Sequence, residues 1–323
     1  MFIPILMFIL GLILLVKGGD WFVDGATGIS RKFHVSEILI GATVVSIGTT
    51  LPEVMVSATD ALHGSGQIAY GNAIGSIICN TALVAATTIA IAPSICNKRD
   101  LFVPISFFFG SAFLYTFVAI YFQSFSRLFG ILLLGIFLAY MVITSIQSIK
   151  DAEDLSDEVP QKLTKQNPLW KDLLFLVLGA ILIAVGANWL VHYGTALAKA
   201  FGVPETVIAL TFVALGTSLP ELVTAISALI KKHSDLSLGN IIGANLFNLV
   251  LVSGLSVTIC PFDLPSAKTI GGMNASLVID IPLMLLVMMI LSLPALIHGK
   301  LRRWQGISLL TLYTAFCLFQ IFL

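Results

Sequence analysis

Two glutamates with matching surroundings are the residues in this chain best suited to do chemistry. Glu53 ends the sequence GTTLPE, and Glu221 ends GTSLPE, 168 residues further on, each inside a long apolar stretch. A carboxylate at the middle of a bilayer costs ~2.5–3.5 kcal/mol on insertion scales, so each needs a compensating partner. No lysine or arginine lies at a similar depth in the apolar stretches. The simplest compensating charge is a bound cation.

Other oxygen-bearing residues accompany each glutamate at helical spacing. Residues at i, i+3, i+4 and i+7 lie on one face of a helix. They are Ser46, Thr49, Thr50 and Glu53 in the first copy, and Ala214, Thr217, Ser218 and Glu221 in the second. Pro52 and Pro220 lack an N–H, so each leaves a carbonyl one turn earlier without its helical partner. We therefore expect an opened turn that offers backbone oxygens beside each carboxylate.

A second stretch in each copy adds amide groups. Ser76 and Asn80 lie four residues apart, as do Ala244 and Asn248. Together the two stretches supply carboxylate, hydroxyl, amide and carbonyl oxygens, which suit hard cations, and Ca²⁺ accepts 6–8 such ligands in flexible geometry. Two negative charges are neutralised by one Ca²⁺, two Na⁺ or two protons. One site could hold these ions alternately, which is the basis of exchange.

The elements that must position these residues are membrane helices. The chain has 323 residues, of which 58% are hydrophobic and 11% charged, and its mean hydropathy is +1.01. Apolar stretches of about 20 residues, long enough to cross a bilayer, recur throughout. We predict an all-α polytopic membrane protein with ten transmembrane helices. They are expected near 2–22, 37–62, 68–92, 101–121, 127–149, 172–197, 204–230, 236–260, 275–297 and 303–323.

The two copies divide the chain into halves. Residues 41–81 match 209–249 without a gap, and 11–25 match 179–193 at the same offset. We predict five-helix repeats at 1–149 and 172–323, joined by a cytoplasmic linker at 150–171. Because five is odd, the second repeat is inverted relative to the first, which is typical of secondary transporters.

Basic residues fix the expected orientation. Fourteen of the 17 lysines and arginines fall in one set of loops and flanking helix ends, and three fall in the other set. The positive-inside rule places the first set in the cytoplasm. We expect a multi-pass protein of the plasma membrane with both termini outside.

Several functional classes are disfavoured. The net charge is zero, so nothing indicates nucleic-acid binding. The four cysteines form no CxxC pair, and we interpret them as small apolar residues. Neither HExxH nor GxSxG occurs, so we expect no enzyme activity and no cofactor beyond the transported ions. We expect a monomer to suffice for transport.

These motifs carry a family resemblance. GTTLPE and GTSLPE, each followed by a GN-x-x-G-x-x-x-x-N segment, resemble the two α-repeats of the cation/Ca²⁺ exchanger superfamily. They are most similar to those of prokaryotic sodium/calcium exchangers, over nearly the whole chain. The resemblance implies antiport of Ca²⁺ against Na⁺ by alternating access, with the helices near 2–22 and 172–197 sliding across the other eight. It also implies that the ions bind at mid-membrane between the helices near 37–62, 68–92, 204–230 and 236–260.

The resemblance also implies residue roles. A central calcium site would use Glu53 and Glu221 with the carbonyls of Thr49 and Thr217. Flanking sodium sites would use Ser46, Thr50, Ser76 and Glu53 on one side, and Ala214, Ser218 and Glu221 on the other. Two positions depart from the family pattern, because Ala244 replaces a serine and Asn248 replaces an aspartate found in some members. These departures put the counter-ion in question.

Three alternatives stay open from the residues alone. Buried glutamates can carry protons, so a proton/calcium exchanger is the first alternative. A passive cation channel is the second, although a single deep site suits exchange better than multi-ion conduction. An intramembrane enzyme with paired carboxylates is the third, and it lacks any supporting motif.

Overall fold

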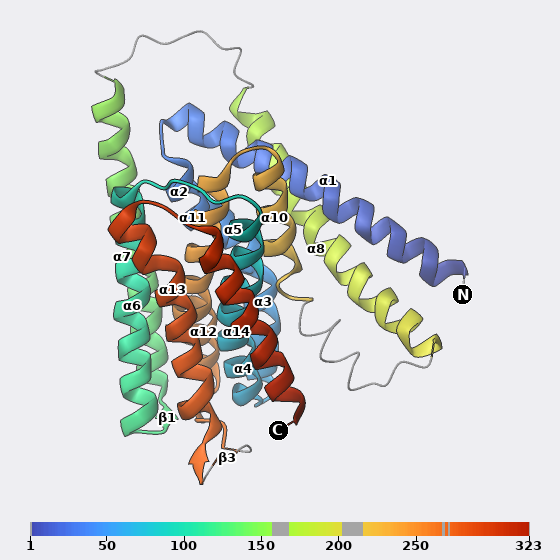
Figure 1. The fold of residues 1–323 in the computed structure, drawn as a ribbon, viewed down its shortest axis with the longest axis vertical. Coiled ribbons are helices and arrows are strands. Elements are labelled where there is room, and N and C mark those ends of the chain that lie inside the picture. Colours follow the sequence, from blue (N-terminus) through green and yellow to red (C-terminus); the bar gives the residue numbers. More distant parts are fainter. Residues whose placement is uncertain (1, 157–167, 202–215, 267–268, 271, 323) are drawn as a thin grey trace.

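The structure is a computed structural model, and it describes residues 2–156, 168–201, 216–266, 269–270 and 272–322. The described chain is almost wholly helical (Figure 1). The helices of the first half are α1 (Phe2–Phe33), α2 (Glu37–Ile40), α3 (Ser46–Leu62), α4 (Gly66–Cys79), α5 (Ala86–Ile91), α6 (Lys98–Tyr121) and α7 (Arg127–Ser156). Those of the second half are α8 (Leu169–Ala200), α10 (Leu219–Ile230), α11 (Ser234–Phe247), α12 (Ser253–Ile259), α13 (Ile281–His298) and α14 (Arg303–Phe322).

Short π-helical segments interrupt several of these helices without breaking them. They are η1 (Gly41–Val45), η2 (Asn80–Ala85), η4 (Asn248–Val252) and η5 (Ser276–Asp280). The described strands are two-residue pairs, in which β1 (Ser124–Phe125) pairs with β2 (Phe262–Asp263) and β3 (Thr269–Ile270) with β4 (Met273–Asn274), both antiparallel.

The helix bounds follow the sequence expectation closely. The composite helices 37–62, 66–91, 234–259 and 276–298 begin and end within two residues of their expected ranges. Eight described helices are long and apolar enough to cross a membrane, and α10 is a shorter apolar helix. The chain is therefore a multi-pass helical membrane protein. The expected helix at 204–230 is described only in part, and the count of ten spans stays a prediction.

The expectation for the first helix is wrong at its C-terminal end. The apolar run ends near residue 22, but α1 continues to Phe33. Beyond residue 22 the helix becomes amphipathic, with Val23, Ala26 and Ile29 buried, and no proline interrupts it. It ends where His34 takes a positive φ of 54°. The expected linker also begins and ends in helix, since α7 reaches Ser156 and α8 starts at Leu169.

The two ends of the helical bundle are chemically different. At one end, which we call the basic end, the segment before α6 pairs with the segment after α13, since Ile95 forms a β-bridge with Lys300. The His233 Nδ1 atom lies 2.8 Å from Glu37 Oε1 at the same end. At the opposite end β1 meets β2, and Gln67 Nε2 donates to the Asp263 carbonyl at 3.2 Å. The loops that carry most of the basic residues thus meet at one end.

The helices α1 and α8 form a pair set at an angle to the remaining helices, which run roughly along one direction (Figure 1). Glycines let the two backbones touch, because a Cβ added to Gly18 would lie 2.8 Å from Ile183 N. The central helices α11 and α12 form the most deeply buried of the eight described spans. In their most apolar 18-residue stretch, 83% of the residues are buried. The candidate site lies on these central helices and on α3, α4 and α10.

Candidate ion-binding site

In the first copy, the four expected residues share a buried face of α3. Ser46, Thr49, Thr50 and Glu53 are each at most 1% exposed. The expectation that Pro52 opens the preceding turn is wrong here, because α3 runs continuously through it. The irregular backbone lies one turn earlier, in η1. Pro52 still has no N–H to donate to the Gly48 carbonyl, but the loss of this one bond does not end the helix.

In the second copy, the described chain enters the helix just before the glutamate. Residues 216–218 form a turn, and α10 starts at Leu219 with Pro220 in its first turn. Proline is well tolerated at a helix start because its missing N–H would have no partner there. Ser218 and Glu221 are buried, and Thr217 is partly exposed. Ala214 lies outside the described residues.

The two carboxylates approach one another in the interior. Glu53 and Glu221 are both 0% exposed, and they are near enough to interact electrostatically. All four of their carboxylate oxygens are buried without a hydrogen-bond partner. Buried charges in such a position are costly unless another charge or donor offsets them. The pair therefore has the geometry of a cation or proton site.

Further unsatisfied polar atoms surround the two carboxylates. Buried side-chain atoms without a partner among the described residues include the hydroxyls of Thr50, Ser218 and Thr224 and the amides of Asn80 and Asn248. Most buried polar groups in folded proteins are hydrogen-bonded, so a concentration of exceptions indicates a binding site. Ser76 is also buried, on the same helical run as Asn80. Every described residue of the expected set thus lies in or beside this interior region, and Thr217 is at its edge.

The two asparagines mark a backbone feature that sequence reasoning missed. The π-helical segment η2 begins at Asn80, and η4 begins at Asn248, its counterpart in the repeat. Such segments occur mostly as single turns at functional sites. No composition or spacing signal in the sequence indicates a π-turn, so only the structure shows it.

Asn240 is a second functional residue that the sequence analysis did not include among the candidate site residues. Its Oδ1 accepts hydrogen bonds from Thr49 Oγ1 at 3.1 Å and Ser46 Oγ at 3.3 Å. Its backbone carbonyl accepts a further bond from Ser46 Oγ at 2.9 Å. Its repeat counterpart, Asn72, donates to Ser57 Oγ at 2.8 Å and to the Glu53 carbonyl at 3.4 Å. The signal in the sequence was the asparagine shared by both copies.

The comparison with known proteins identifies the family. A family model described as "Sodium/calcium exchanger protein" matches residues 3–146 and 171–322. The chain belongs to the sodium/calcium exchanger protein family. The expected family is therefore confirmed.

Two individual proteins and a solved structure align with nearly the whole chain. The sodium/calcium exchanger MaX1 of Methanosarcina acetivorans is 30% identical, and the alignment covers 96% of each chain. The membrane protein MJ0091 of Methanocaldococcus jannaschii is 36% identical over 95% of this chain and 94% of its own. The solved structure of the sodium-calcium exchanger NCX_Mj superposes with a TM-score of 0.78 at 31% identity, over 97% of each chain.

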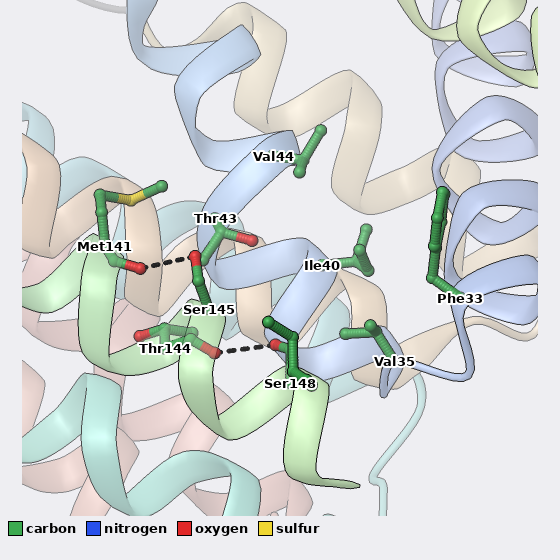
Figure 2. A pocket seen from close by; sticks show the side chains of 10 residues that line it. Phe33, Val35, Ile40, Thr43, Val44, Met141, Thr144, Ser145 and Ser148 are labelled. Carbon is green, nitrogen blue, oxygen red and sulfur yellow. Dashed lines mark hydrogen bonds between the residues drawn. The ribbon is translucent and has the colours of Figure 1, made fainter. Parts of the chain in front are cut away.

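One cavity in this exchanger-family chain lies away from the carboxylates. It has a volume of about 520 Å³ and lies between the end of α1, the η1 segment and α7 (Figure 2). Three of its hydroxyls, on Thr43, Ser145 and Ser148, donate to carbonyls one turn earlier in their own helices. The cavity wall is therefore mostly apolar, and it is no candidate for binding a bare cation.

Proposed function

We propose that this protein is a secondary antiporter that exchanges Ca²⁺ for Na⁺ across the membrane. The observation that carries the proposal is the buried carboxylate pair, Glu53 and Glu221, whose oxygens have no hydrogen-bond partner. Membership of the sodium/calcium exchanger family supports the choice of ions. The ions are cargo, and the described residues contain no group of three His, Cys, Asp or Glu that would indicate a resident metal.

The proposed calcium site uses the two carboxylates and the backbone oxygens beside them. Glu53 and Glu221 supply two negative charges, which one Ca²⁺ neutralises. We assign the carbonyls of Thr49 and Thr217 as further ligands, since Thr49 lies on the buried face of α3 that carries Glu53. A Ca²⁺ ion at such a site replaces water ligands by protein oxygens at 2.3–2.6 Å.

The proposed sodium sites flank the calcium site. On the first-repeat side we assign Ser46, Thr50 and Ser76, and on the second-repeat side Ala214 (through its carbonyl) and Ser218. The amides of Asn80 and Asn248, both buried and without partners, supply neutral oxygens between the two sides. Ala244 is buried where Ser76 stands in the first repeat, so the two sodium sites differ in their hydroxyl count.

The proposed architecture is ten membrane spans in two inverted repeats, 1–149 and 172–323, with both termini outside. The bundle supports this, because the loops rich in lysine and arginine meet at the basic end. Alternating access would come from the α1–α8 pair moving relative to the other helices. Glycine contacts that join α1 to α8 support movement as a unit. A monomer would contain the whole site.

The test is calcium uptake into vesicles that contain the purified protein. An outward sodium gradient is expected to drive uptake of radioactive calcium, and replacing sodium by potassium is expected to abolish it. Uptake that ignores sodium would contradict the proposal.

A proton/calcium exchanger is the second candidate. It is favoured by one observation, the close approach of two buried carboxyl groups that could each carry a proton. Vesicles with a pH gradient and no sodium distinguish it, since only this candidate predicts calcium uptake there.

A further inference from the structure

The α1–α8 pair meets the rest of the molecule closely along α10. A Cβ added to Gly19 would lie 2.6 Å from Ser227 Oγ and 2.7 Å from Val223 Cγ1, so the two helices are in direct contact. A larger residue at this position would have to push aside the Ser227 and Val223 side chains. The contact lies on the side of the molecule that leads toward the basic end, where α10 finishes at Ile230.

An ion pair closes this contact at the basic end. Lys231, the residue after α10, places its Nζ atom 2.7 Å from Asp24 Oδ1 and 3.8 Å from Asp20 Oδ1. The same ammonium donates to the Asp20 backbone carbonyl at 2.7 Å. One lysine thus binds two acidic residues of α1. Because these acids are four residues apart, they are one turn apart on the same face of the helix.

The internal repeat shows that this ion pair exists at one end only. The counterparts of Asp20, Asp24 and Lys231 at the offset of 168 are Asn188, His192 and His63. An amide and two imidazoles cannot form a carboxylate–ammonium pair. In an inverted repeat, the contacts that close one end have counterparts that close the other. The ion pair therefore breaks a symmetry that the fold otherwise provides.

We propose that Lys231, Asp20 and Asp24 are positioning residues that form a one-sided latch, favouring the conformation in which α1 covers the basic end. This inference rests on the proposed exchange function and on movement of the α1–α8 pair. A contact that forms in only one of two conformations stabilises that conformation by the free energy of the contact, and the ratio of the two populations changes accordingly. Partly exposed ion pairs are weak, so the shift expected is about two- to five-fold.

The latch predicts opposite changes in ion affinity at the two faces. An ion on one side of the membrane reaches the site only in the conformation that is open to that side. The apparent affinity measured from that side therefore rises when this conformation becomes more populated. In Lys231→Met the conformation open at the basic end gains population. The calcium concentration for half-maximal exchange should therefore fall at the basic end and rise at the opposite end, and the ratio of the two concentrations should change about two- to five-fold.

The experiment measures sodium-driven calcium exchange in inside-out and right-side-out vesicles containing the full chain. The matched control is Lys232→Met, because Lys232 is the adjacent lysine and is exposed. Asp24→Asn is the second variant, and it is suited to this role because Asp24 is 51% exposed and its replacement disturbs no packing. Both latch variants should shift the two faces oppositely, and the double variant should shift them no further than Lys231→Met alone, because Lys231 makes every contact of the latch.

Three results would overturn the latch. The first is an unchanged ratio between the two faces, including an equal change at both; the second is an unchanged affinity in both latch variants; the third is the same shift in Lys232→Met. If the unmodified protein shows no sodium-driven calcium movement, the exchange function itself fails, and that outcome is separate from a failure of the latch.

Discussion

Replacing Glu53 by glutamine tests the reasoning about the carboxylate pair most directly. The side chain is 0% exposed, both of its oxygens lack partners, and Glu221 is its charged neighbour. With one charge removed, a bound Ca²⁺ would leave a net buried positive charge. Removing one partner of a buried charge pair costs about 3–5 kcal/mol. Since 1.4 kcal/mol is a factor of ten in affinity, calcium binding should weaken by about 100- to 3,000-fold.

The assay is calcium binding to purified Glu53→Gln by calorimetry, together with the melting temperature in chelator. The melting temperature without ions is expected not to fall, because glutamine has nearly the shape of glutamate and carries no buried charge. The control is Asp60→Asn, seven residues further along the same helix and only half-buried. If Glu53→Gln binds calcium within about three-fold of the unmodified protein while the control is also unaffected, the carboxylate pair is not the calcium site.

Three further predictions follow from the same contacts. Asn240→Ala removes the acceptor of the Thr49 hydrogen bond, while Ser46 keeps its backbone acceptors. One such bond is worth about 0.5–1.5 kcal/mol, so calcium affinity should fall by about 2- to 12-fold in a titration. An unchanged affinity would contradict the positioning role. Gly243→Ala places a methyl group against Ser46 Oγ and the η1 backbone, so it should lower the melting temperature, whereas Gly135→Ala, which meets no atom within 4 Å, should not. Calcium at 100 times its dissociation constant should stabilise the purified protein by about 2.7 kcal/mol, measured by thermal unfolding, and Mg²⁺ at the same concentration should stabilise it less.

The duplicated motif made most of the candidate site predictable from the sequence. A glutamate in an apolar stretch is costly, so its presence twice at one offset indicated a shared cation. The helical spacing from Ser46 to Glu53 then gave the correct buried face of α3. The ranges of the central helices were also predictable, because each apolar run is bounded by polar residues at membrane length.

The features that could not be predicted depend on contacts between distant helices. The same Leu-Pro-Glu pattern lies inside a continuous helix at Pro52 and in the first turn of a helix at Pro220, so the local sequence alone does not decide where the helix begins. The role of Asn240 depends on α11 packing against η1, 194 residues from Ser46. The extension of α1 to Phe33 depends on a burial pattern that begins only after the apolar run has ended.

The π-helical turns at Asn80 and Asn248 bear on when the internal repeat arose. A π-turn holds one more residue than the α-helical turn that it replaces. Both halves carry the turn at the same place, and the offset of 168 holds on either side of it without a gap. The extra residue was therefore already present in the single ancestral half, before the gene doubled.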